Sequence, residues 1–155
     1  AQLSSSRKFG VDSERDVRLA TEACGANAPK DVARLVAKLA TLGKDCLPLC
    51  QGPDELTDLQ IDFDIVAEDI SQLYTDAWLR DRAYTSMVAA EAFDGTCSFS
   101  DMVYLPLRCN LARPLYDMVV VDEAQDLNAG QLLLARRLCK EGGRIVVVGD
   151  DCQAI

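Results

Sequence analysis

Apolar residues in the first part of the chain recur at the spacing of helices. Ser13 and the acidic residues after it are typical of a helix start, and the apolar residues that follow share one face. Pro29 is expected to open a second helix, in which apolar residues repeat every three or four positions, and Gly43 is expected to end it. The stretch 44–60 contains two prolines and a glycine, which predicts a loop.

A longer helical pattern runs from about Phe63 to Phe93 and ends at the pair Asp94-Gly95. This stripe could bind a partner or stack against nucleic-acid bases, but a packed helical core is the commoner explanation of such spacing. Its apolar positions are Ile65, Val66, Ile70, Leu73, Tyr74, Ala77 and Trp78.

The last third of the chain has a different pattern, with two valine-rich runs on either side of an amphipathic segment. After a short helix near 99–107, it predicts a strand at 117–122, a helix at about 128–140 capped by Asn128, and a strand at 145–149. Continuous β-branched runs are typical of strands buried on both faces of a parallel sheet. The order strand, helix, strand predicts that the two strands are parallel.

Composition limits the class of protein without identifying it. The 155 residues are enough for one domain or two small subdomains, and 49% of them are hydrophobic. No apolar run is long enough for a membrane span and the start of the chain has no signal-peptide pattern, so we expect a soluble, cytoplasmic protein. The net charge of −9 argues against a broad nucleic-acid surface on this chain alone.

The cysteines do not form a recognisable metal-binding pattern. There are seven of them and no histidine, and the closest pair, Cys46 and Cys50, is poorly spaced for a zinc knuckle. Reduced thiols packed as small apolar side chains are the better interpretation in a cytosolic protein.

Both valine-rich runs end in acidic residues. Asp122 and Glu123 follow the first run, and Asp150 and Asp151 follow the second. The carboxyl ends of parallel strands border the crevice in which open α/β sheets bind their ligands. A nucleotide-hydrolysing enzyme needs an acid pair there, one carboxylate to hold Mg²⁺ and its neighbour to orient or deprotonate the attacking water.

These segments resemble motifs of a known family. Val-Asp-Glu-Ala-Gln-Asp at 121–126 and Val-Gly-Asp-Asp-Cys-Gln-Ala-Ile at 148–155 resemble motifs II and III of superfamily 1A DNA helicases of the UvrD/Rep/PcrA type. Ser-Phe-Ser-Asp-Met-Val at 98–103 resembles the segment that leads into motif II. The implied fold class is α/β: residues 97–155 would be part of a RecA-like P-loop NTPase parallel sheet, and residues 1–96 an all-helical subdomain like the 1B insertion.

The resemblance also implies a role for each site residue. Asp122 would hold Mg²⁺ through a water molecule, and Glu123 would be the catalytic base or water-orienting residue. Gln125 and Asp126 would tie the nucleotide site to neighbouring motifs, and Gln153 would contact the γ-phosphate of ATP. ATP and Mg²⁺ are thus the implied ligands.

One essential part of such an enzyme is missing from the 155 residues, because no Gly-x-x-x-x-Gly-Lys-Ser/Thr loop occurs among them. We therefore expect a fragment, inactive alone, of an ATP-dependent helicase that moves 3′-to-5′ on single-stranded DNA and unwinds duplex DNA. The remaining helicase subdomains would be its partners, and no membrane is expected. The alternative hypothesis is a non-catalytic, helicase-derived module that binds a partner.

Overall fold

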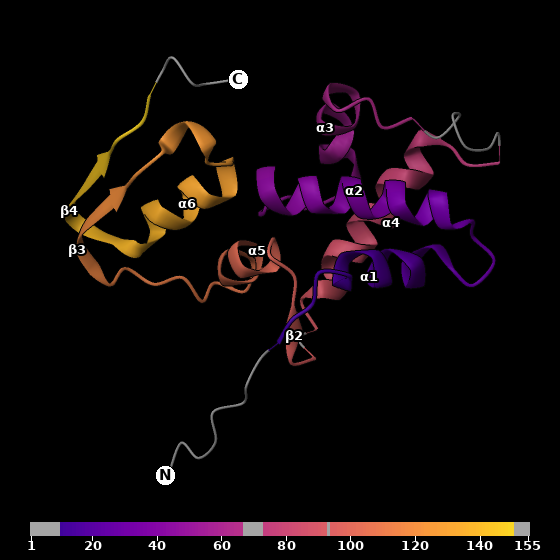
Figure 1. Cartoon of the computed structure of the whole chain (residues 1–155), viewed down its shortest axis with the longest axis horizontal. Coiled ribbons are helices and arrows are strands. Elements are labelled where there is room, and N and C mark those ends of the chain that lie inside the picture. The colour runs from indigo at the N-terminus through magenta and orange to yellow at the C-terminus, as the bar shows by residue number, and fades with distance from the viewer. Residues whose placement is uncertain (1–9, 67–72, 93, 151–155) are drawn as a thin grey trace, which may run out of the picture.

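The computed structural model describes residues 10–66, 73–92 and 94–150. A group of helices lies at one end of the molecule, two strands with one helix lie at the other end, and α5 lies between them (Figure 1). The helical end contains α1 (Arg15–Cys24), α2 (Lys30–Cys46), α3 (Thr57–Asp62) and α4 (Asp76–Ala90). The opposite end contains β3 (Tyr116–Val121), α6 (Ala129–Leu138) and β4 (Cys139–Val147), and the helix between the two ends is α5 (Asp101–Arg108).

The hydrophobic core lies in the helical group, where α1, α2 and α4 pack against one another. Tyr104 of α5 belongs to the same core, and α5 contacts both α2 of the helical group and α6. Tyr74 and Trp78 pack against the core, which favours the core interpretation of their stripe over a binding face. The fully buried members include Ala20, Val36, Leu39, Ala40, Leu56, Ile65 and Ala83.

The prediction that Gly43 ends the second helix is wrong. The helix continues to Cys46, and Gly43 lies within it, facing α4. A Cβ atom at Gly43 would lie 2.6 Å from Sδ of Met87 and 3.0 Å from Cδ2 of Leu56. The glycine is therefore a packing residue, and the energy of that contact outweighs its low helix propensity.

The prediction of a loop over 44–60 and of one helix over 63–93 is also wrong in the described residues. A 3₁₀ turn at Pro53–Leu56 and α3 occupy the supposed loop, whereas Asp64 has a φ of 48°, which no α-helix accommodates. Helix α4 begins only at Asp76, where the hydroxyl of Thr75 accepts the amide of Trp78 at 3.2 Å. Positions 67–72 and 93 lie outside the described residues.

The elements predicted for the last third are confirmed. Strands β3 and β4 pair in parallel, with Val119 opposite Ile145, and α6 connects them. Asn128 caps α6 and forms a reciprocal capping box with Gln131. Local signals were sufficient here because cap, helix and strands each have their own sequence pattern.

The expected burial of these strands on both faces is not found. Met118 and Val120 of β3 are each 59% exposed, and Val121 is the buried residue of that strand. Burial of a strand requires neighbouring strands and helices. Among the described residues, this sheet consists of β3 and β4 alone, with α6 packed against them.

A second, shorter pair of strands brings the start of the helical group next to its end. Strand β1 (Gly10–Val11) runs parallel to β2 (Thr96–Cys97), so the segment before α1 lies beside the segment before α5.

No helix in the described ranges has both the length and the apolar composition that crossing a bilayer requires.

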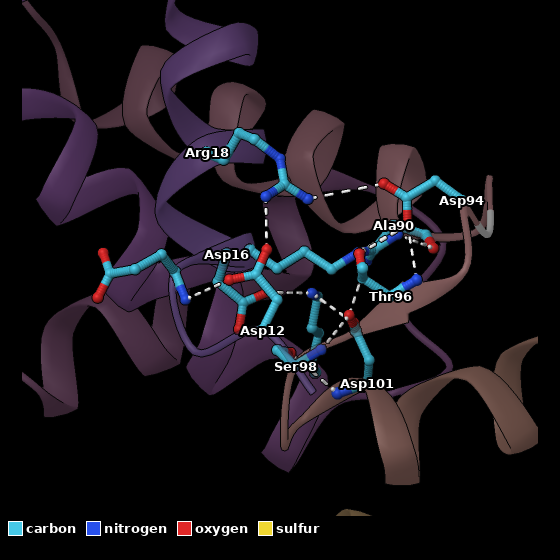
Figure 2. A network of polar contacts seen from close by, with 11 residues as sticks. Asp12, Asp16, Arg18, Ala90, Asp94, Thr96, Ser98 and Asp101 are labelled. Atoms are coloured by element: carbon cyan, nitrogen blue, oxygen red, sulfur yellow. Dashed lines mark hydrogen bonds and ion pairs between the residues drawn. The ribbon is translucent and has the colours of Figure 1, made fainter. Parts of the chain in front are cut away.

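Four charged residues from three helices are joined by ion pairs, and we call them the charge cluster: Arg15 and Asp16 of α1, Lys44 of α2 and Asp101 of α5. Figure 2 shows the carboxylates of Asp16 and Asp101 pointing inward from different elements. The two cations and Asp101 are completely buried. The formal charges of the four residues in the charge cluster cancel, which is the condition for keeping ionised groups in a protein interior.

Candidate functional site

The predicted acidic pair lies at the carboxyl end of the β3–β4 sheet. Because the strands are parallel, the residues after β3 and after β4 meet at one edge. Two backbone hydrogen bonds close this edge: Val148 N donates to Val121 O at 2.8 Å, and Ala124 N donates to Val148 O at 3.0 Å. The segments beginning at Asp122 and at Val148 are thus held side by side.

Glu123 has a backbone conformation that sequence reasoning did not anticipate. Its φ of 50° and ψ of 46° lie in the left-handed region, which costs an L-residue about 1–2 kcal/mol. The amide of Glu123 donates to Asp122 Oδ1 at 3.0 Å, and Asp126 N donates to Glu123 O at 3.0 Å. A non-glycine residue held in this region is a frequent feature of functional sites, and here it marks the candidate base.

Gln125 connects the two acidic segments through its side chain. Its Nε2 donates to Glu123 Oε2 at 2.7 Å, and its Oε1 accepts the amide of Asp150 at 3.1 Å. A Cβ atom at Gly149 would lie 2.7 Å from that Oε1. The φ of Gly149 is not positive, and the absence of a side chain at this residue leaves room for the Gln125 amide.

The other predicted site residues are placed less fully. Asp126 ends the short 3₁₀ turn η2 (Ala124–Asp126), and this residue is exposed beside the acidic pair. Gln153 lies outside the described residues, so its expected position next to the pair is not tested.

The residues present fit a magnesium ion that keeps most of its water. Asp122 and Glu123 are both exposed, and one oxygen of Asp122 already accepts the Glu123 amide. Nowhere in the described part of the chain do three His, Cys, Asp or Glu residues gather closely enough to hold a metal ion by themselves. Mg²⁺ is commonly bound by one or two carboxylates together with water and substrate phosphates, which is the arrangement this site could offer.

Comparison with known proteins identifies the family. The UvrD/REP helicase N-terminal domain family matches residues 32–155, from the start of α2 to the last residue. The chain therefore belongs to the UvrD/REP helicase N-terminal domain family. No curated protein and no solved structure matches the chain. The family match includes most of the helical group, whereas the quoted motifs covered only the last third.

Proposed function

We propose that this chain is part of an ATP-dependent DNA helicase, and that Mg²⁺–ATP binds at the carboxyl end of β3 and β4. The observation that carries this proposal is the joined arrangement of Asp122, Glu123 and Gln125 in a chain of the UvrD/REP family. In this proposal residues 97–155 belong to a RecA-like ATPase domain, and residues 1–96 form a helical insertion like subdomain 1B.

Each acidic-site residue has a distinct chemical task. Asp122 would hold a magnesium ion through water, and the ion would supply neutralisation of the charge on the phosphates. Glu123 orients the attacking water or accepts its proton. The Gln125 amide cannot act as a base, but its hydrogen bond fixes the Glu123 carboxylate in one orientation.

Movement along DNA requires more than this chain. The net charge of −9 offers little attraction to a phosphate backbone. The remaining helicase subdomains are proposed to supply the basic DNA contacts, the phosphate-binding loop and the arginines that stabilise the transition state. With them, the protein would move 3′-to-5′ on single-stranded DNA and unwind duplex DNA.

The isolated 155-residue chain is expected to hydrolyse no ATP. Phosphoryl transfer depends on positioning and charge neutralisation, and the lysine loop that supplies both is missing from the sequence. Phosphate release with Mg²⁺ and single-stranded DNA measures this. Turnover that persists through purification and disappears in Glu123→Gln would contradict the expectation.

The proposal is tested in the full-length protein by comparing Glu123→Gln with Asp122→Ala. The amide of Glu123→Gln keeps the shape of the side chain and removes the base, so hydrolysis should stop while ATP affinity stays within about twofold. Asp122→Ala should instead weaken Mg²⁺-dependent ATP binding. Unaltered hydrolysis in both variants would favour the alternative, a non-catalytic module that binds a partner.

Gln153 is proposed to couple the nucleotide to DNA. Loss of one hydrogen bond to the γ-phosphate should cost about 1–3 kcal/mol, less than loss of the base. In full-length Gln153→Ala, ATPase activity should remain measurable while the base pairs unwound per ATP decrease. An equal decrease of hydrolysis and unwinding would make Gln153 an ordinary active-site residue.

A further inference from the structure

The end of α2 and the start of α5 are joined by a buried ion pair. Lys44 Nζ donates to Asp101 Oδ1 at 2.7 Å, and both side chains are fully buried. The other carboxylate oxygen, Oδ2, accepts Arg15 Nη1 at 2.7 Å and the amide of Ser98 at 3.0 Å. Asp101 is thus the shared counterion of two buried cations, and it fixes the first turn of α5 against α1 and α2 (Figure 2).

The residues next to this ion pair form a notch that receives α6. Asp45 follows Lys44 at the end of α2, and Val103 lies two residues after Asp101 in α5. A Cβ atom at Gly130 would lie 2.7 Å from the carbonyl oxygen of Asp45 and 3.3 Å from Cγ1 of Val103. Gly130 is buried in the first turn of α6, so only a residue without a side chain fits this notch.

The same turn of α6 is continuous with the candidate site. The 3₁₀ turn η2 ends at Asp126, and Asn128 caps α6 two residues before Gly130. The capping box holds this short connection, because Asn128 and Gln131 exchange hydrogen bonds of 3.0 and 2.9 Å. A displacement of Gly130 therefore moves the segment that carries Glu123.

We propose that Gly130 and the notch beneath it form a joint that positions the Glu123–Asp126 segment on the helical group. The Lys44–Asp101 pair keeps the two walls of the notch together. In this role Gly130 and Asp101 are positioning residues, since neither contacts the candidate nucleotide site. The inference rests on the proposed function, in that Glu123 must act in hydrolysis for its position to matter.

The joint predicts a specific effect of one added methyl group. In Gly130→Ala the new Cβ would meet a backbone carbonyl, so α6 or α2 must shift by several tenths of an ångström. A misplacement of 1 Å can lower an enzymatic rate about 100-fold, so a smaller shift should lower kcat about tenfold. In the proposed function the phosphate-binding loop outside this segment supplies most of the contacts to ATP, so the KM for ATP should change by less than about twofold.

An unobstructed position for Gly130 predicts the opposite sign for stability. Alanine is a better helix former than glycine, so an unobstructed Gly130→Ala change should raise the melting temperature. With the joint present, the melting temperature should not rise. Gly52→Ala is the matched control, because Gly52 has an extended φ of −166° and nothing within 4 Å of an added Cβ.

The experiment uses the full-length protein and its Gly130→Ala, Gly52→Ala and Val103→Ala variants. Steady-state ATPase assays with single-stranded DNA give kcat and KM, and hydrogen exchange reports the amides of 119–128. The joint predicts a lower kcat, an unchanged KM and faster exchange in Gly130→Ala, with Gly52→Ala like the wild type. Val103→Ala removes part of one wall of the notch. It should change kcat and amide exchange in the same directions as Gly130→Ala, but by smaller amounts.

The outcomes separate the joint from the proposed function. Unchanged kcat and exchange in a folded Gly130→Ala variant overturn the joint, as does a raised KM with unchanged kcat. If the wild type hydrolyses no ATP, the proposed function fails, and exchange of 119–128 alone decides the joint. If Gly130→Ala does not fold, Val103→Ala decides: wild-type values for both readouts overturn the joint.

Discussion

The helical group and the β3–β4 strand pair differ in how completely their apolar side chains are buried. In the helical group, side chains from α1, α2 and α4 bury one another, and even three charged residues, Arg15, Lys44 and Asp101, are fully enclosed. In the strand pair most apolar side chains are exposed, as Met118 and Val120 show. The first region has a complete core, whereas the second has only part of one.

The difference in burial separates the region with the core from the region with the candidate acids. The candidate acids lie at the exposed edge of the strand pair, and their geometry depends on short local contacts such as the hydrogen bonds of Gln125. Helix α6 of this second region contacts α2 and α5, both of which contribute to the core of the helical group. An exposed apolar sheet surface of this kind is typical of a region that packs against further structure.

The largest effect is expected from Asp101→Asn. Removing one partner of a buried charge network leaves uncompensated cations, which costs about 3–5 kcal/mol of unfolding free energy. The matched change in the strand region is Asp117→Asn, which breaks the exposed Asp117–Lys140 pair and should cost less than about 1 kcal/mol. Urea unfolding measures both. Equal losses would remove the contrast between the two regions.

An identical apolar substitution in each region gives the next largest difference. Val36 is 0% exposed in α2, and Val120 is 59% exposed in β3. Val36→Ala should lower the unfolding free energy by about 2 kcal/mol through lost burial and a small cavity, and Val120→Ala by about 0.5 kcal/mol or less. If Val120→Ala is as costly as Val36→Ala, β3 is buried in solution by structure that these residues do not include.

Acid should remove the contribution of Asp101 to the stability of the protein. Burial opposes ionisation of Asp101, but the charge and hydrogen bond of Lys44, the Ser98 amide and the charge of Arg15 outweigh it, so its pKa lies below the ordinary 3.8. Its contribution to stability is therefore complete above about pH 4 and is lost as the pH falls through the lowered pKa.

The measurement is the urea midpoint between pH 6 and pH 2.5 for the wild type and Asp101→Asn. Their difference should shrink as the pH falls below about 4. Burial raises the pKa of Asp45, so this residue changes the stability with pH in the opposite direction. The contribution of Asp45 is common to the two proteins and is removed when their midpoints are subtracted. A difference that stays constant over this range would contradict a lowered pKa of Asp101.

The smallest expected effect is on the rate of Gln125→Ala in the full-length protein. The change removes the hydrogen bonds of Gln125 to the Glu123 carboxylate and to the Asp150 amide. Only the first of them acts on the candidate base, and its loss is worth about 1 kcal/mol, or roughly fivefold in kcat. Stability should hardly change, because the bridge is near the surface. A loss of stability without a loss of kcat would make Gln125 a structural residue only.

Sequence reasoning succeeded where the signals are local. The capping residue Asn128, the helix that it begins and the two valine-rich strands were predicted because each feature depends on neighbouring residues. It failed at Gly43, since a contact with Met87 from another helix decides that position. The charge cluster has no local pattern, because Arg15, Lys44 and Asp101 are far apart in the sequence.

The candidate site was predictable in composition but not in geometry. The acidic pair and Gln125 were identified by their motif, whereas the left-handed backbone of Glu123 and the bond from Gln125 to Asp150 depend on how β4 ends beside β3. Strand burial was mispredicted for a related reason: a valine-rich strand has the capacity for burial, but its neighbours decide whether burial occurs.

Hydrogen exchange of the full-length protein with and without Mg²⁺ and a non-hydrolysable ATP analogue tests most directly where the nucleotide binds. If the strand edge is the nucleotide site, the amides of 121–126 and 148–150 should exchange more slowly with the analogue, because ligand contacts suppress local opening. Exchange in α1, α2 and α4 should stay the same. Slower exchange confined to those helices, with the two strand ends unaffected, would contradict the assignment of the site.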